Sequence, residues 1–596
     1  QFYLYKDLEN LFVRQGDEAK LRLLNQAYYS GDWSIIAKKG NEGFYFFSDE
    51  DVAAIRSSAK TQWGKKIIAD LEQKVKERRK HSLEVPKEEG GHFHDYFCPV
   101  HNLQFTFRWD KPLAQYCSAC DKEWIGNNRY DWAWIYEVHM LNRDYMYQCM
   151  YLYLATGKRQ YADYIRTMVL DYAGKYAGWF EHNSGRKATD QHSGKAFAQS
   201  LDEANWATKV AMAYMAIKPV LSKEEVKAIE EGYLQPAATL LLHRPAGANW
   251  QMWHNSGLAA LGIALENDSI VDVAINKDKY GYHYLIGKHK NSDGWINKGS
   301  PHYHYYPLEA LLFTANAVKC RGIKLFDKDL HDMFVEPVKG TYPDLSFPAH
   351  SDGWYGANLL SQSALYEVGN ARYNDPFLKR VLELTYAQKK RLDPEALLSN
   401  QLIKASEESL LQKSYSFDTS GFCLLRSDTR TVVLKFGGEG IGHGHPDKLS
   451  ITIHDGKNEL VSDFGTSGYG VPDYLKWYKR TLSHNTVTVD AKDQKRSVGK
   501  LLKFNPRSDG GYAEAETTTA YPGVRMKRSL DLKGTHLQDV YTCTSDSSHL
   551  YEYVILFNEK PLMDGQPTAT TLTGSEVHER IHNIFSYPHK SGFTCR

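Results

Sequence analysis

Two different hydrophobic periods divide the chain. From Arg129 to about Leu411, apolar residues recur every three or four positions, with Gly, Asn or Pro turns between the runs. From about Ser414, short apolar runs bounded by Gly, Asp and Asn are typical of antiparallel strands. The pattern predicts an α+β multidomain protein, in which helical hairpins build a toroid or solenoid and a β-sandwich follows. We expect the ligand groove where the two parts meet.

The two periods also give the expected elements. Helices are predicted at residues 145–156, 161–172, 201–217, 223–242, 256–266 and 308–318. Strands are predicted at residues 421–426, 431–436, 450–453, 459–463, 487–489, 511–516, 525–531 and 551–557. The expected domains are therefore 1–128 (helical and hairpin segments), 129–411 (helical toroid) and 412–596 (sandwich).

The first 80 residues alternate helical and turn-like segments. A helix is predicted from the acidic cap at Asp49 through the charged stretch 72–80, whose charges indicate a solvated face. Residues 86–91, which contain Pro and two Gly, then predict a linker or long loop.

Four potential metal ligands follow this loop at knuckle spacing. They form two pairs, and two residues separate the members of each pair. A hairpin-sized insert lies between the pairs, and its residues 103–109 alternate like a strand. This arrangement indicates a structural zinc site with no open position, and the alternative is a disulfide. The four residues are Cys98, His101, Cys117 and Cys120.

Composition narrows the class of protein. The 596 residues exceed one ordinary core, and 73 basic against 72 acidic residues argue against nucleic-acid binding. Aromatic residues form 13% of the chain, and their faces suit sugar rings. No apolar run reaches membrane-spanning length and no signal peptide is visible. Because the chain starts at Gln1, we expect a mature exported bacterial protein, periplasmic or extracellular.

Histidines and an aspartate in the β-rich part form a candidate metal set. His445, Asp463 and His484 could close on one cation, because short strands and loops bring such residues repeatedly to one point. Imidazole and carboxylate together favour zinc or a similar metal over calcium. His443 is left to face a substrate if the flanking glycines bend the segment. The alternative is surface histidines in a Gly-rich hairpin.

Two polar and aromatic clusters precede expected apolar helices. One runs from Asn249 to Leu258 and contains His254 and Asn255, and the other covers residues 299–308. Each alone is more often structural, since His caps helices and Tyr packs. Combined with His443, and without a Ser or Cys nucleophile or a nucleotide-binding loop, they suit β-elimination on a uronic acid. We expect no organic cofactor.

These motifs resemble the heparinase II/III superfamily of polysaccharide lyases. The resemblance covers about Arg129 to the C-terminus and is strongest in the β domain. It implies an incomplete (α/α) toroid joined to an antiparallel β-sandwich, and cleavage of heparan sulfate, other glycosaminoglycans or alginate. The matching segments are 249–255, 299–306, 443–450, 463–466 and 483–487.

The resemblance also implies roles. His254 would be the base at C5 or its partner, and Tyr303 the acid for the leaving oxygen, with Tyr305 or Tyr306 as competitors. His443 would neutralise the carboxylate with Asn255 or Asn249, although relatives place Asn before the His rather than after it. The metal triad would be structural. Further residues expected to contact substrate are Trp250, His302, Tyr305, Arg480 and the loop 350–355.

The expected activity is therefore a lyase on an anionic uronate polysaccharide. A glycosaminoglycan is the first substrate expected and alginate the second. Two other classes remain open: a glycoside hydrolase using Asp202–Glu203 or Asp352 as its carboxylates, and a sugar-binding protein without catalysis. The sequence does not indicate an oligomeric state.

Overall fold

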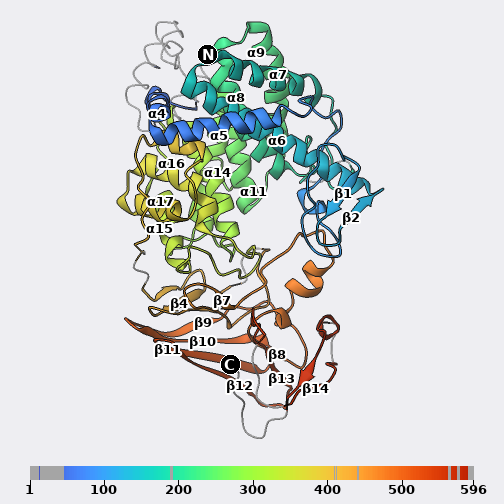
Figure 1. Cartoon of the computed structure of the whole chain (residues 1–596), viewed down its shortest axis with the longest axis vertical. Helices are drawn as coiled ribbons and strands as arrows, with labels where there is room; N and C mark the ends of the chain where they lie inside the picture. The colour runs from blue at the N-terminus through green and yellow to red at the C-terminus, as the bar shows by residue number, and fades with distance from the viewer. Residues whose placement is uncertain are drawn as a thin grey trace.

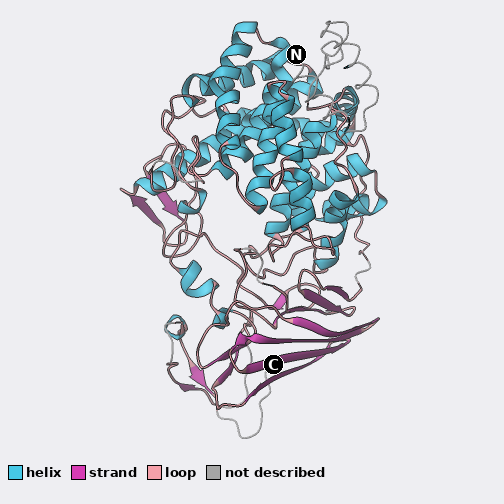
Figure 2. Ribbon diagram, turned by 180° about the vertical axis from the view of Figure 1, so that it is seen from behind, coloured by secondary structure: helices cyan, strands magenta, loops and turns pink. Residues whose placement is uncertain are grey.

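Most helices and most strands occupy separate halves of the molecule (Figures 1 and 2). The computed structural model describes residues 46–187, 192–408, 410, 413–438, 442–560, 566–573 and 577–587, with Val13 and Leu24. The segments expected before residue 46 thus lie outside the described residues, apart from these two. The division into helical and β halves confirms the expected fold class. The domain boundaries near residues 129 and 412 stay predictions.

The helix expected from Asp49 to residue 80 is two helices. α4 (Asp49–Lys60) begins with a capping box, in which the Ser48 hydroxyl and the Asp51 carboxylate each accept from the other residue's backbone N–H. Thr61 is extended and caps α5 (Gln62–Arg78), because its hydroxyl accepts from the backbone N–H of Gly64 at 2.9 Å. This second cap was missed, so the single-helix prediction was wrong.

The helical half is built from hairpins of successive helices (Figure 1). The long α6 (Asn128–Thr156) ends at Gly157, which has the positive φ of +68° typical of a helix C-cap. The other α-helices of the described residues, with the π-helical turn η3, are α7 (Arg159–Tyr176), α8 (Ser200–Ile217), α9 (Lys223–Ile229), η3 (Glu230–Leu234), α10 (Gln235–Leu242), α11 (Ala248–Ala264), α12 (Asp268–Asn276), α13 (Tyr282–His289), α14 (His302–Lys319), α15 (Lys328–Val335), α16 (Ser363–Tyr373) and α17 (Pro376–Gln388).

Two helices that reach the domain boundary begin earlier than predicted. α11 begins at Ala248 rather than Ser256, and nearly all of its residues are buried between α8 and α14. A helix buried on all sides shows no polar face, so its period is hard to recognise. α14 begins at His302 rather than Leu308 and contains Pro307. Both polar clusters are therefore first turns of helices.

The β half is a sandwich of unequal layers. Within the described residues, an eight-stranded antiparallel sheet has the order β12-β11-β10-β4-β5-β6-β7, with β3 paired to β4. The pair β8–β13 packs on it through Val487 and Val489. Strand bounds are β3 (Tyr415–Phe417), β4 (Phe422–Arg426), β5 (Thr431–Lys435), β6 (Ser450–His454), β7 (Glu459–Val461), β8 (Val487–Val489), β9 (Lys500–Arg507), β10 (Gly510–Tyr521), β11 (Val524–Lys533), β12 (His536–Ser545) and β13 (Tyr551–Tyr553).

Strand β4 joins the two halves. Successive side chains of a strand point to opposite faces. Phe422 and Leu424 enter the core of the helical half, whereas Cys423 and Leu425 enter the core of the sandwich. All residues of β4 are buried, as expected for a strand covered on both faces. The halves therefore share a packed interface, which fixes loops of one against helices of the other.

A hairpin, β1 (Ala114–Cys117) with β2 (Lys122–Ile125), projects beside the helices (Figure 1). Across the described parts of the chain, we find no helix that combines the length and apolar character needed to cross a bilayer.

Candidate functional site

A cavity of about 690 Å³ lies where the helical half meets loops of the sandwich. Its helical wall comes from the starts of α8, α11 and α14 and from the segment before β1. His443 and Tyr469 close it from the β half. The lining residues are His92, Phe93, His94, Phe97, Asn102, Leu103, Gln104, Tyr136, Gln199, Leu201, Asp202, Asn249, Trp250, His302, Tyr303, Tyr306, Trp354, His443 and Tyr469.

Two tyrosines from the two halves meet in this cavity. The hydroxyl of Tyr303, in the first turn of α14, is in hydrogen-bond contact with the hydroxyl of Tyr469. The Tyr303 ring also stacks on the imidazole of His443, with 3.6 Å between centroids. Burial raises the pKa of both tyrosines well above the usual value. Both are therefore neutral hydroxyls at pH 7, able to donate and to accept.

Asp352 holds the β side of this cluster. Its carboxylate contacts Nδ1 of His443 at 2.8 Å and Nε2 of His445 at 2.9 Å, and it accepts from the hydroxyls of Tyr469 and Tyr474, both at 3.2 Å. Burial alone would raise the pKa of Asp352, but the hydrogen bonds with the two histidines hold it well below its usual range. Asp352 is thus an anion that orients both rings.

His443 lies in the cavity as predicted. Burial lowers its pKa, although the hydrogen bond with Asp352 acts in the opposite direction. A neutral His443 donates its Nδ1 proton to Asp352, so Nε2 is left as the second polar atom of the ring.

Three further predicted residues line the helical wall. Asn249 is 3% exposed, and its Oδ1 has no hydrogen-bond partner within the described residues. A buried amide without a partner costs free energy unless a ligand pairs with it, so Asn249 is a candidate for binding a polar group of the substrate. Trp250 and His302 lie nearby in the lining. Burial lowers the pKa of His302 to about 4, so it is neutral at pH 7.

The structure does not bring His254 or Asn255 to the cavity. Both side chains are buried within the helical half, and neither lines the cavity. The Asn255 amide donates to the Tyr280 carbonyl at 2.7 Å and accepts from Gln251 at 2.9 Å, which is a structural role. His254 is fully buried and burial lowers its pKa to about 4. Asn249 and Trp250, which lie before the predicted helix start at residue 256, line the cavity instead.

Tyr305 and Arg480 also lie outside the lining. Tyr305 points to the opposite side of α14 from Tyr303, and its hydroxyl is hydrogen-bonded with that of Tyr366 at 3.1 Å. Arg480 forms an ion pair with Asp493 at 2.6 Å. Tyr306, three residues after Tyr303, shares its face and lines the cavity, as helical geometry requires.

The carboxylates considered for hydrolysis do not form a pair. Glu203 accepts from Tyr176 and from the backbone N–H groups of residues 195–197, so it is a structural anchor. Asp352 is fully buried and bound to two histidines. Only Asp202 lines the cavity, and burial raises its pKa to about 7. A glycosidase needs two carboxylates across one bond.

Tyr469 was missed by sequence reasoning. It lies between Gly468 and Gly470, where a Cβ would come within 2.7 Å of the Phe97 ring and 2.6 Å of the His94 carbonyl. The two glycines thus let the loop approach the helical half so closely that the Tyr469 ring stacks on His94, at 4.2 Å between centroids. The Gly-Tyr-Gly triplet was the available signal.

The predicted metal triad is close to a ligand cluster. Ligand atoms of Asp447, Asp463 and His484 lie within 4.8 Å of one another, and His445 lies beside them with its ring 5.2 Å from that of His484. Within the described residues, Nδ1 of His445 and Nε2 of His484 are buried without a hydrogen-bond partner. Two orphaned ring nitrogens beside a carboxylate fit a divalent cation. Asp447 was not predicted. It also contacts Lys435 and Lys448.

The four knuckle residues also come together. Ligand atoms of Cys98, His101, Cys117 and Cys120 all lie within 4.8 Å of one another. The cysteines in the described chain are free thiols, which argues against the disulfide alternative.

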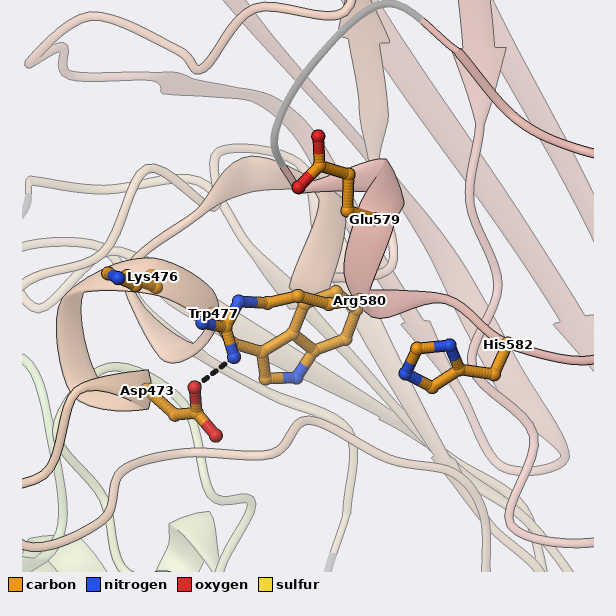
Figure 3. A pocket seen from close by; sticks show the side chains of 6 residues that line it. All are labelled: Asp473, Lys476, Trp477, Glu579, Arg580 and His582. Carbon is orange, nitrogen blue, oxygen red and sulfur yellow. Dashed lines mark hydrogen bonds and ion pairs between the residues drawn. The ribbon is translucent and has the colours of Figure 1, made fainter. Parts of the chain in front are cut away.

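A second, polar cavity lies beside η7 (Tyr474–Tyr478), outside the predicted site. Figure 3 shows Asp473 paired with Arg580 next to the indole of Trp477. Asp473 also accepts from the Asn102 amide at 3.2 Å. The same helical turn therefore contacts the lining residue Asn102 through Asp473 and Asp352 through Tyr474.

Comparisons with known proteins agree with this architecture. A family model described as "Heparinase II/III-like, C-terminal" matches residues 410–562, and one described as "Alginate lyase" matches residues 138–335. An alginate lyase of Stenotrophomonas maltophilia is 28% identical over 71% of this chain and 63% of its own length. An exo-oligoalginate lyase of Saccharophagus degradans is 25% identical over 72% and 64%. The chain thus spans slightly less than two thirds of each relative.

Solved structures show the same fold. A crystal structure of heparinase III gives a TM-score of 0.55 at 13% identity, over 94% of this chain and 83% of that one. A heparan sulfate lyase from Pedobacter heparinus gives 0.52 at 15% identity, over 92% and 80%. Two segments of the chain therefore match family models of polysaccharide lyases, one heparinase II/III-like and one described as alginate lyase, and the fold is that of the solved heparinases.

Proposed function

We propose that the chain cleaves a uronate polysaccharide by β-elimination and leaves a 4,5-unsaturated uronate. The contact between the Tyr303 and Tyr469 hydroxyls carries this proposal. It joins two neutral proton carriers in a cavity that the buried Asn249 also lines and whose described lining holds no carboxylate pair. This set of groups suits proton transfer rather than hydrolysis.

The elimination needs three contributions. The carboxylate must be neutralised so that the proton at C5 becomes acidic, and the side chain of Asn249, which lines the cavity, can donate to it through Nδ2. The C5 proton must be taken by a base, for which we propose Tyr469. The oxygen at C4 must receive a proton as its bond to C4 breaks, and we assign this step to Tyr303.

The hydrogen bond between the tyrosines allows both transfers without a charged intermediate on either ring. Tyr303 gives its proton to the leaving oxygen, the Tyr469 proton turns from Asp352 to Tyr303, and the C5 proton replaces it on Tyr469. The electron pair of the C5–H bond forms the C4=C5 double bond. Since burial raises the pKa of both tyrosines, a relay that avoids a tyrosinate lowers the barrier.

His443 and Asp352 position this pair. The stacked ring of His443 fixes Tyr303, and the anionic Asp352 fixes the His443 ring through Nδ1. This arrangement resembles the orientation of a catalytic imidazole by a buried carboxylate, which keeps the ring in one tautomer.

For the substrate we favour an unsulfated uronate polymer such as alginate. None of the described lining residues is Lys or Arg, the side chains that usually bind sulfate groups. The relatives with the widest coverage here are named alginate and oligoalginate lyases. This reverses the order expected from sequence. Heparan sulfate stays the second candidate, because a heparin-sulfate lyase of Bacteroides stercoris is 25% identical over 40% of this chain.

We also propose that His445, Asp463 and His484, with Asp447 beside them, hold one structural zinc ion. Histidine and carboxylate ligands favour zinc over calcium or magnesium. The ion would make the β wall, which is the side of the cavity formed by His443 and Tyr469, more rigid. His445 is bound to the same Asp352 that orients His443. Because polymeric substrates are found outside the cell, we further propose that the protein is exported.

Ultraviolet absorbance of the unsaturated product tests the proposal. The protein is incubated with alginate, hyaluronan, chondroitin sulfate and heparan sulfate, alongside the Tyr469→Phe variant. We expect absorbance to grow with alginate and the variant to lose it. Growth only with a sulfated polymer would contradict the substrate proposal. Shortened chains without absorbance would contradict elimination.

A further inference from the structure

We propose that Cys98, His101, Cys117 and Cys120 bind one zinc ion, and that this ion fixes the cavity wall formed by residues 92–104. The second half of this inference rests on the proposed function, because it assigns the wall a role in binding the polysaccharide. The first half stands on the geometry of the four ligands alone.

The four ligand atoms have the separations of a zinc tetrahedron. With Zn–S bonds of about 2.3 Å, the edges of a tetrahedral site are about 3.8 Å. The Sγ atoms of Cys98 and Cys120 are 4.0 Å apart, and Nδ1 of His101 is 3.8 Å from Sγ of both Cys98 and Cys117. A disulfide would need about 2.05 Å between two sulfurs and would not require the histidine.

Two tight turns present these ligands. In the first, Cys98 N–H donates to the Leu103 carbonyl and its own carbonyl accepts from Asn102 N–H, with Asn102 at a φ of +56°. In the second, the β1–β2 hairpin pairs Cys117 with Lys122, so Cys120 lies in the turn between the strands. Paired turns of this kind are the usual framework of a four-ligand zinc site.

The surrounding core is too small to hold these turns by packing alone. Its buried apolar members include only Tyr96, Phe105 and Ala133 besides the cysteines, within the described residues. Modules with so little core usually need a metal or disulfides for stability. Because the cysteines are free, a metal is the cross-link that this module can use.

The same turn reaches the cavity. Asn102, Leu103 and Gln104 follow the ligand His101 directly, and all three line the cavity. Upstream of Cys98, His94 stacks on Tyr469 and Phe97 packs against Gly468. A metal at Cys98 and His101 therefore holds both the wall and the contacts that position the proposed base.

Substitution of His101 separates zinc binding from the other properties of the chain. His101→Cys would create a four-cysteine site that keeps zinc, whereas His101→Ala removes a ligand. Cys543→Ser is the matched control, because Cys543 is a half-buried cysteine on β12 outside the site. We expect the knuckle residues to bind one zinc ion per chain in the wild type, in the control and in His101→Cys. In His101→Ala we expect the zinc content to fall by one ion per chain.

Metal analysis should be combined with hydrogen exchange of residues 92–104 and 468–470. We expect faster exchange in both segments in His101→Ala and wild-type exchange in His101→Cys. With oligouronate substrate, we expect KM to rise about tenfold or more and kcat to fall in His101→Ala, because the wall binds substrate and its His94 positions Tyr469, whereas both constants should stay near the wild-type values in His101→Cys.

Two results would overturn the inference. A wild-type protein whose zinc content does not change in His101→Ala would contradict the metal site. Loss of zinc with unchanged exchange and unchanged KM would contradict its role in the wall. If the wild type cleaves no uronate polymer, the proposed function fails, but zinc content and hydrogen exchange still decide the metal site and its effect on the wall.

Discussion

The ring of Tyr303 lies flat on the imidazole of His443, with 3.6 Å between their centroids and 20° between their planes. Tyr303 comes from the helical half and His443 from the sandwich, so the contact exists only when both are in place. The reactive pair is therefore assembled at the interface that β4 holds together. A change that separates the halves should abolish activity before it unfolds either half.

Tyr303→Phe should remove the proposed acid while keeping the stacked ring. We expect kcat for the uronate polymer to fall about 10²–10⁴-fold, the usual contribution of a positioned proton donor, with a small change in KM. Steady-state ultraviolet kinetics measure this. Tyr305→Phe is the control, because its hydroxyl contacts Tyr366 away from the cavity and should cost only about 1 kcal/mol of stability. Equal losses in both variants would contradict the assignment.

Asn249→Ala should remove the amide proposed to neutralise the carboxylate. We expect kcat/KM to fall about 10²–10³-fold, as when one donor to a developing anion is lost. Asn255→Ala should keep kcat/KM but lower the free energy of unfolding by about 1–3 kcal/mol, because partners of its two hydrogen bonds stay buried. Denaturant titration and kinetics on both variants separate the roles. Loss of activity in Asn255→Ala at unchanged stability would restore Asn255 as a catalytic candidate.

The sequence predicts the fold class and the β side of the site well, for a physical reason. Strands alternate regularly, so the loops between them that carry His443 and His445 could be located in the sequence. The helical side was predicted less well because α11 is buried on all faces. Its polar residues, such as Gln251 and Asn255, are satisfied inside the core and resemble loop residues in the sequence. The sequence located both polar clusters, but it gave no reason to prefer Asn249, which lines the cavity, over Asn255 as the residue that neutralises the carboxylate.

Tyr469 and Asp352 show a different limit. Their roles depend on tertiary contacts of two loops, and a local signal such as the Gly-Tyr-Gly triplet marks a close approach without naming the partner. Helical period alone does separate Tyr303 and Tyr306 from Tyr305, since residues three apart share a face. That argument becomes available only once α14 is known to begin at His302 rather than at Leu308.

Removal of the proposed metal from the His445 and His484 site should loosen the β wall. A metal that binds only the folded chain adds about 2.7 kcal/mol at 100 times its Kd, so a chelator should lower the melting temperature. His484→Ala should lose one zinc per chain and should no longer respond to chelator through this site. His549→Ala is the control, because His549 pairs with Asp490 away from it. Unchanged zinc content in His484→Ala would contradict this site.

His254 should act on stability through pH rather than on catalysis. Its pKa is lowered by burial to about 4, whereas an unfolded histidine has about 6.5. As pH falls from about 6.5 to 4, the unfolded state takes up this proton and the folded state does not, so stability is lost over that window. The loss from this residue is up to about 3 kcal/mol.

His254→Gln removes the titrating group and keeps a polar side chain. We expect its unfolding free energy to fall less than that of the wild type between pH 6.5 and 4, and its kcat at neutral pH to stay within a few-fold. Denaturant titrations across this range, with kinetics at pH 7, measure both. A fall in kcat of about 10²-fold or more at unchanged stability is the loss expected for a general base, and it would make His254 the base despite its burial. The pH dependence of stability and the loss of activity thus separate the structural role of His254 from the catalytic one.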